Sequence, residues 1–320
     1  MSAYILRRIL LVIPTLIIVT IILFITMRLI PGDVIDTMLG EMGTESMGGG
    51  IDREALEQKL GLDLPIHVQY GRWIGDIFLH GSLGNALKGG QPVVDKILTK
   101  LPVTFELGIL AIIIGLVIAL PIGVYSAIRQ DTIGDYFGRS LAIIFISIPS
   151  FWMGTMIMIY PSIWWSWSPP MELIQFADDP LGNLGMFIIP AVVLGMLLSG
   201  TTMRMTRTMM LEVCRQDYIR TAWAKGLKER VIIMRHVMKN ALIPVVTIVG
   251  LQLPILVGGS VIIEQIFVLP GLGRLMIEAL NYRDYPTVSG VNLFVATTVV
   301  GLNLIIDLTY GYLDPRVHYR

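Results

Sequence analysis

Six apolar runs dominate this sequence, and each is long enough to cross a lipid bilayer as a helix. They cover residues 8–29, 104–128, 138–161, 184–205, 241–265 and 287–310. A helix needs about 20 predominantly apolar residues to cross the roughly 30 Å hydrocarbon core, where the backbone must satisfy its own hydrogen bonds. Only 15% of the residues are charged, against roughly 25% in a soluble domain. The sequence therefore predicts an all-α integral membrane protein with six transmembrane helices.

The first run resembles a secretory signal, because Arg7 and Arg8 precede an apolar core. That core extends from Ile9 to Met27, which is longer than the usual core of about 7–15 residues, and no small-x-small cleavage site follows it. We therefore expect residues 1–30 to be retained as the first transmembrane helix.

The Lys and Arg residues between the runs predict the orientation of the chain. Residues 204–239 carry nine of them against three acidic residues, whereas the 162–185 connection carries three acidic residues and no Lys or Arg. Loops rich in Lys and Arg stay in the cytoplasm. We expect both termini in the cytoplasm of a cell with this protein in its inner membrane, and external segments at 31–103, 162–183 and 266–286.

The chain thus divides into a first helix, an external (periplasmic-side) insertion at 31–103, a five-helix core at 104–310 with cytoplasmic helices at 212–239, and a cytoplasmic tail at 311–320. Within the insertion, Asp52 is placed to cap a short helix, "REALEQKL". "QPVVDKILTKLP" at 91–102 is amphipathic, which predicts a helix along the membrane surface before the second span. The alternative is a packed external helix.

Between the fourth and fifth runs the chain turns basic. "DYIRTAWAKGLKERVIIMRHVMKNALIP", from Asp217 to Pro244, predicts two helices broken at Gly226. In the first, Ala222 and Gly226 are four apart and share a face. In the second, apolar residues recur at helical spacing: Leu227, Val231, Met234 and Met238. The small residues of the first helix indicate that a protein groove comes close to it.

"RTAWAKG" at 220–226 resembles the cytoplasmic EAA loop of binding-protein-dependent ABC import permeases, although Arg220 and Thr221 replace its first two residues and the usual downstream proline is displaced to Pro244. Other stretches resemble the dipeptide, oligopeptide and nickel branch of that family. They are "ILRRILLVIPTL", "RLIPGD", "LGLDLPIHVQY", "GSLG", "SIPSFWMG", "PGLGRLMIEALNYRDYP" and "DPR". Their order and spacing cover essentially the whole chain, which is most similar to the first (B-type) permease subunit.

The resemblance implies a type I ABC importer permease fold and a non-catalytic subunit that moves peptides or related small solutes. It implies a coupling helix that docks on an ATPase, formed by Arg220, Thr221, Ala222, Ala224, Lys225, Gly226 and Leu227. The implied partners are a second homologous permease, two ABC ATPases, an external solute-binding protein and the lipid bilayer. No Walker A pattern occurs in the sequence, so we expect no cofactor in this chain and ATP and Mg²⁺ on the ATPases.

Five residues are candidates for the translocation path or an outer gate. Glu264 and Gln265 end the fifth run, and a carboxylate there could meet the amino terminus of a peptide or pair with Arg274. Pro149 is one of five prolines inside the runs that predict kinks and hinges. Asn303 and Asp307 are four apart in the last run. We expect both to face the bundle interior and to form polar contacts between helices rather than to bind solute.

Other classes of function have less support. An intramembrane protease needs a catalytic pair inside its spans, but no His lies in an apolar run and Asp307 is the only aspartate deep in one. The four dispersed histidines lack metal-ligand spacing, and the zero net charge gives no indication of nucleic-acid binding. The alternative is an ion or solute channel subunit not coupled to ATP. The solute stays open among dipeptides, longer peptides, nickel complexes, opines and oligosaccharides.

Overall fold

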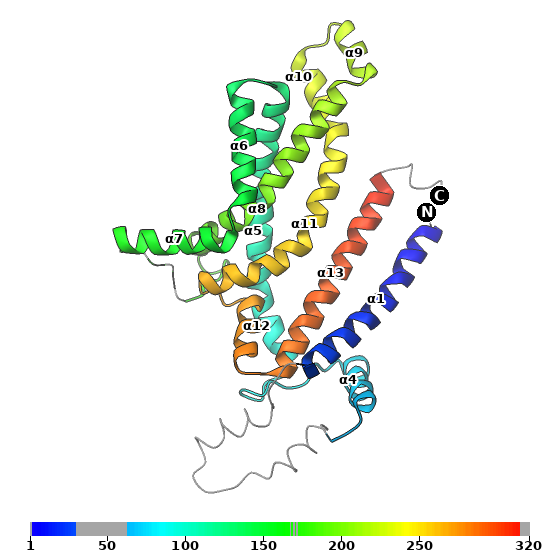
Figure 1. Cartoon of the computed structure of the whole chain (residues 1–320), viewed down its shortest axis with the longest axis vertical. Helices are drawn as coiled ribbons and strands as arrows, with labels where there is room; N and C mark the ends of the chain where they lie inside the picture. Colours follow the sequence, from blue (N-terminus) through cyan, green and yellow to red (C-terminus); the bar gives the residue numbers. More distant parts are fainter. Residues whose placement is uncertain (1, 30–62, 167, 169, 171, 314–320) are drawn as a thin grey trace. The chain divides into compact units, whose positions relative to one another are not determined.

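The computed structural model describes residues 2–29, 63–166, 168, 170 and 172–313, and these are almost entirely helical (Figure 1). The helices are α1 (Ser2–Leu29), α4 (Ile66–His80), α5 (Val93–Ile128), α6 (Ile133–Ser147), α7 (Ser150–Trp165), α8 (Pro180–Cys214), α9 (Asp217–Ala224), α10 (Glu229–Val231), the π-helix η1 (Ile232–Val237), α11 (Met238–Ile266), α12 (Leu272–Asn281) and α13 (Tyr285–Leu313). The predicted helix at "REALEQKL" and most of the predicted tail at 311–320 lie outside the described residues.

Among the described residues, five helices are long and apolar enough to cross a membrane, and a bent pair brings the number to six if the pair is counted as one span. The five are α1, α5, α8, the continuous α10–η1–α11 segment and α13. The bent pair is α6 with α7. The predicted all-α class is confirmed, with one correction to the third span.

The third span is not one straight helix, as we had predicted for residues 138–161. α6 and α7 meet at an angle of 92°. The break falls at Ile148, whose backbone is extended (φ −83°, ψ 121°), and at Pro149, which precedes α7. Proline lacks the N–H that a continuing helix needs and disfavours the helical conformation of the residue before it. With 15 residues, α6 is about 22 Å long, which is less than the thickness of the hydrocarbon core.

The other prolines inside the runs do not interrupt their helices. Pro190 lies within α8, and Pro244 and Pro254 lie within α11. α11 nevertheless bends along its length (Figure 1). Of the predicted hinges, only Pro149 therefore coincides with a break between two helices.

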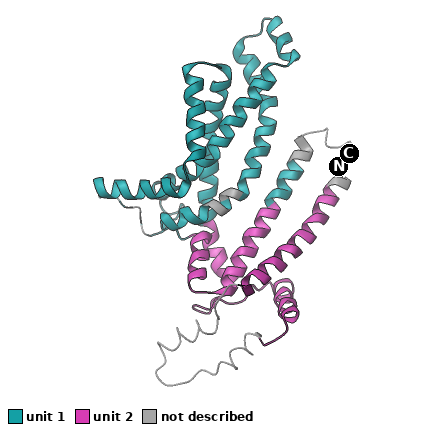
Figure 2. Cartoon of the chain, viewed as in Figure 1, with its two compact units in different colours: residues 1, 103–270, 302–320 teal, residues 2–102, 271–301 magenta. Residues whose placement is uncertain are grey.

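The chain forms two compact units, coloured separately in Figure 2. The larger unit comprises 103–270 and 302–320, and its core lies around α8. Glycines bring α5 and α8 together: a Cβ on Gly195 would lie 2.8 Å from the carbonyl oxygen of Ala111, and one on Gly123 would lie 3.0 Å from that of Met203. Such contacts leave no room for a side chain, so α5 and α8 pack as a tight pair.

The second unit comprises 2–102 and 271–301. Its apolar cluster joins the start of α5 to α12 and α13 through Ala86, Val93, Ile97, Leu272, Leu275 and Val291. The buried carboxylate of Asp284, just before α13, accepts hydrogen bonds from the Leu87 and Thr287 N–H groups at 3.1 and 3.3 Å. These contacts fasten the 81–92 loop to the start of α13.

The membrane-surface helix predicted at 91–102 is wrong as a separate element. Residues 93–102 form the first turns of α5, which continues without a break to Ile128. Val93 and Ile97 are buried at 0% and 2% exposure and Leu101 packs against the same apolar cluster, whereas Leu98 is 57% exposed. The packed-helix alternative is the one that the structure supports.

Candidate functional site

The basic connection between α8 and α11 (residues 215–237) contains α9, the helix with the predicted coupling residues. α9 begins after Gln216, whose extended backbone ends the preceding turn. Thr221 donates its hydroxyl to the Asp217 carbonyl at 3.0 Å, and Asn240 of α11 donates its side-chain N–H to the Tyr218 hydroxyl at 2.9 Å. The first bond stabilises α9 internally, and the second fixes α9 to α11.

Gly226 ends this helix in the left-handed conformation, with φ +73°. The Leu227 N–H donates to the Ala222 carbonyl at 3.4 Å and the Gly226 N–H donates to the Trp223 carbonyl at 2.9 Å, the two bonds of a Schellman motif. The predicted break at Gly226 is confirmed. A Cβ at Gly226 would meet nothing within 4 Å, so glycine is favoured here by its backbone conformation and not by a close neighbour in this chain.

One face of α9 is buried against its own chain. Ile219 and Ala222 are 1% and 6% exposed, and they pack in an apolar cluster with Ala127, Met210, Ile232, Val237 and Ala241. The prediction that Ala222 offers a small surface to a protein groove is therefore wrong. Its small side chain instead lets α9 approach the helices of its own chain.

The opposite face of α9 is uncovered. Trp223 is 50% exposed, Tyr218 is 45% exposed and Leu227 is 37% exposed, and four further predicted coupling residues are also exposed: Arg220, Thr221, Ala224 and Lys225. Arg220 forms a 3.4 Å ion pair with Asp217, with both side chains in solvent, and such pairs contribute little to stability. The exposed face therefore combines two aromatic rings with positive charge, a composition typical of protein interfaces.

The segment after Gly226 differs from the prediction in its register. Residues 232–237 form the π-helix η1, in which hydrogen bonds connect residues five apart. Accordingly the buried residues are Ile232 and Val237, five apart, followed by Ala241. Met234, from the predicted apolar face, is 56% exposed. The predicted face assumed α-helical spacing, which η1 does not have.

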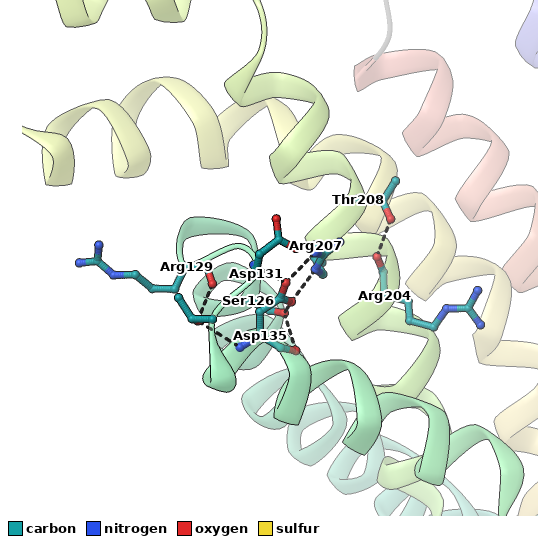
Figure 3. Close-up of polar contacts among 8 residues, drawn as sticks. Ser126, Arg129, Asp131, Asp135, Arg204, Arg207 and Thr208 are labelled. Carbon is teal, nitrogen blue, oxygen red and sulfur yellow. Dashed lines mark hydrogen bonds and ion pairs between the residues drawn. The ribbon is translucent and has the colours of Figure 1, made fainter.

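A buried ion pair joins α6 to α8, the helix that leads directly to the 215–237 connection (Figure 3). Arg207 donates from Nε to Oδ1 and from Nη2 to Oδ2 of Asp135, both at 2.7 Å. The Asp135 side chain is fully buried and that of Arg207 is 19% exposed. A two-pronged arginine–carboxylate contact fixes orientation as well as distance.

Two further groups donate hydrogen bonds to the Asp135 carboxylate (Figure 3). Ser126 of α5 donates its hydroxyl to Oδ1, and the Asp131 N–H donates to Oδ2 at 3.0 Å. Thr132 caps α6 by accepting the Asp135 N–H at 3.4 Å. The carboxylate thus holds α5, the 129–132 turn, α6 and α8 in one arrangement, directly before the connection that carries α9.

Glu264, one of the candidates for an outer gate, lies in the packed core. Its side chain is fully buried, and Oε1 accepts a 2.7 Å hydrogen bond from the Thr104 hydroxyl of α5. Arg274 forms an ion pair with Glu278 at 2.9 Å, and its pairing with Glu264 stays a prediction. A carboxylate enclosed in this way supports a structural role for Glu264 in this conformation.

The other four path candidates do not form one polar surface with Glu264. Gln265 and Pro149 are exposed. We expected Asn303 and Asp307 both to face the bundle interior, but only Asp307 is half-buried, whereas Asn303 is exposed on this chain. Residues four apart in an α-helix differ in direction by about 40°, which is enough to separate a covered residue from an exposed one.

Sequence reasoning missed Asp135, Ser126 and the role of Arg207. Arg207 was counted among the basic residues of the 204–239 stretch, and nothing in the sequence paired it with a carboxylate 72 residues earlier. The signal available was local: "DTIGD", in which Thr132 stands three residues before Asp135, is a helix-capping pattern. It identifies the start of α6 but not the partner on α8.

Comparison with known proteins identifies the chain. The family model for the binding-protein-dependent transport system inner membrane component matches residues 119–319, and the model for the N-terminal part of such components matches residues 1–108. The chain belongs to this family. It is a permease subunit of an ABC importer and a multi-pass membrane protein, as the predicted resemblance implied.

Two relatives match over the full length of both chains. A putative peptide transport system permease protein of Brucella suis biovar 1 is 41% identical over 322 residues. The dipeptide transport system permease protein DppB of Escherichia coli K12 is 40% identical over 344 residues. The match over the whole length includes the insertion after α1 as well as the membrane core.

Two solved structures share the fold of the core. An amino acid ABC transporter crystallised with histidines aligns with a TM-score of 0.55 and 13% identity, over 68% of this chain and 94% of that one. The MetNI methionine ABC transporter in an inward-facing conformation aligns with a TM-score of 0.53 and 18% identity, over 68% and 96%. The predicted type I ABC importer permease fold is confirmed.

Proposed function

We propose that this permease subunit imports peptides, with dipeptides as the first class to test. The support is the 40–41% identity, over the complete chain, to relatives named for peptide and dipeptide transport. Nickel complexes, opines and oligosaccharides are the competing solutes. The chain belongs to an importer family, so the channel alternative loses its basis.

Reconstitution tests the solute class. The permease is co-purified with its partner subunits, placed in lipid vesicles and supplied with ATP and its solute-binding protein. We expect ATP-dependent uptake of a labelled dipeptide and none of a labelled oligosaccharide or nickel complex. Uptake of one of these other solutes without dipeptide uptake would contradict the proposal.

We propose that the exposed face of α9 docks on an ATPase subunit and carries its motion into the membrane helices. The observation that supports this most is the division of α9 into a face anchored by its own chain, through Ile219 and Ala222, and an uncovered face with Trp223 and Lys225. α9 follows α8 after two residues, and α8 is fixed to α6 by Arg207. A force applied to α9 is therefore transmitted to α8, which the Arg207–Asp135 ion pair holds against α6.

The complete importer, in this proposal, holds this chain, a second homologous permease, two ATPases and a solute-binding protein. The exposed amide of Asn303 supports the second permease, because an amide in a spanning helix needs a hydrogen-bonding partner that lipid chains lack. The chain itself is non-catalytic and holds no cofactor, and the ATPases bind ATP and Mg²⁺. Transport proceeds by alternating access, with the right-angle break at Pro149 as a candidate hinge.

We propose that both termini and the 215–237 connection lie in the cytoplasm, and that the solute-binding protein docks on the 31–103 and 266–286 side. Cysteines test this orientation in a Cys214→Ser background, one replacing exposed Glu172 and one replacing exposed Lys228. An impermeant thiol reagent added to intact cells should label Glu172→Cys alone. Labelling of Lys228→Cys from outside would reverse the topology.

A further inference from the structure

The amphipathic helix α4 has an apolar side that its own unit covers only in part. Apolar residues follow one another at four-residue steps along it, at Ile66, Tyr70, Ile74 and Phe78, whereas Gln69, Arg72, Asp76 and His80 form a polar stripe on another side. α4 contains no fully buried residue, and Ile66 and Phe78 are 63% and 80% exposed. Large apolar side chains exposed together on one side of a helix mark a surface that contacts protein or membrane.

Contacts with α1 fix the level at which α4 sits. The Tyr70 hydroxyl is 2.9 Å from the Thr20 hydroxyl of α1. The Phe24 ring of α1 contacts the rings of Tyr70 and Trp73, with centroids 5.4 and 6.0 Å apart. α4 therefore packs along the last third of α1.

α1 crosses the membrane, so its residues serve as depth markers. Thr20 lies twelve residues after Arg8 and nine before Leu29, the end of the helix, which is about 18 Å and about 13 Å along its axis. In a core of roughly 30 Å that begins at Arg8, Thr20 lies about 12 Å below the surface of the second leaflet, and Phe24, which contacts Tyr70 and Trp73, lies about 6 Å below it. Arg28, whose guanidinium lies 5.2 Å from the Phe24 ring centroid, marks the interface above it.

We propose that α4 lies in the boundary between lipid headgroups and acyl chains beside α1, with Phe78 inserted among the acyl chains and Arg72 facing water. Tyr70 and Trp73 are the residue types that concentrate at this level of a bilayer. The occupant of the apolar side of α4 is thus phospholipid, in the outer leaflet under the proposed topology. This inference needs only that α1 spans the membrane, and it is independent of the solute.

Spin labels test the placement in the reconstituted importer. Cysteines replace Phe78, Arg72 and, as a reference within α1, Ile22, each in a Cys214→Ser background. Ile22 is 57% exposed and Arg72 is exposed, so none of the labels disturbs a packed core. The complexes are placed in vesicles of phosphatidylethanolamine and phosphatidylglycerol. Collision rates with oxygen, which concentrates in lipid, and with a water-soluble nickel chelate are then measured.

We expect the label at Phe78 to match that at Ile22, with high oxygen and low nickel access, and the label at Arg72 to show several-fold higher nickel access. High nickel access at Phe78 would place α4 in water and overturn the proposal. Low access to both reagents there would mean that protein, such as the second permease, covers it, which also overturns the proposal. A label at Arg72 that behaves like that at Phe78 would exclude an interfacial helix as well.

Discussion

Arg207 donates two 2.7 Å hydrogen bonds to the Asp135 carboxylate across the interface between α8 and α6. The carboxylate is fully enclosed and also accepts from Ser126 and from the Asp131 N–H. The pair therefore braces α8 just before the chain enters the 215–237 connection. Its removal should affect both stability and the coupling of ATP hydrolysis to transport.

Removing both members of this pair should cost less stability than the sum of the two single removals. Asp135→Ala or Arg207→Ala leaves a charge without its partner, at about 3–5 kcal/mol. The double variant leaves neither charge, so its loss of thermal stability should be clearly smaller than the sum of the two single losses. Thermal unfolding of the four proteins in detergent measures this coupling. Additive losses would show that the two side chains do not act together.

Aspartate at two neighbouring positions of α9 should have opposite effects. Ala222→Asp places a carboxylate in the apolar cluster with Ile219 and Ile232, which should destabilise the chain by several kcal/mol. Ala224→Asp lies on the exposed face and should leave the unfolding temperature nearly unchanged. We expect Ala224→Asp to lose the ATPases in co-purification while its fold persists. A stable Ala224→Asp chain that keeps its ATPases would contradict the docking assignment.

Substitution of Gly226 should be limited by backbone conformation. Gly226→Ala forces a residue with a Cβ into φ +73°, at a cost of about 1 kcal/mol, although nothing blocks the added atom. Gly226→Asn should be tolerated better than Gly226→Val, because asparagine adopts this conformation more readily than β-branched residues do. The rate of proteolysis within residues 215–237 reports the loosening. Equal rates for the asparagine and valine variants would argue against this explanation.

The Thr104 hydroxyl should matter because Glu264 is buried. Thr104→Val removes a donor to an enclosed carboxylate and should destabilise the chain by about 1–3 kcal/mol. Thr104→Ser keeps the hydroxyl and should lose less. Thermal unfolding compares the two variants, and solute uptake by the serine variant should stay near that of the parent. If both variants unfold at the same temperature, the hydrogen bond to Glu264 contributes nothing.

The parts of the fold that were predictable from sequence depend on composition and local backbone chemistry. The long apolar runs predict the spanning helices, and Gly226 predicts the end of α9, because both signals act within a few residues. The direction of Ala222 was not predictable, since small residues suit a close contact with the same chain as well as with another. Arg207 and Asp135 come together only through the packing of α6 on α8. Similarly, "RVIIMRHV" carries no clear mark of π-helical spacing.

The π-helix η1 fixes how far α11 is rotated about its axis relative to α10. A π-helical hydrogen bond connects residues five apart, one more than the four of an α-helix, and one residue corresponds to about 100° of rotation. Deleting a single residue from 232–237 would let an α-helix continue from α10 into α11 and would turn one around its axis relative to the other. The anchored and free faces of α9 would then no longer align with the spanning helix. A one-residue deletion should therefore be less tolerated here than in the exposed turn that precedes Glu229.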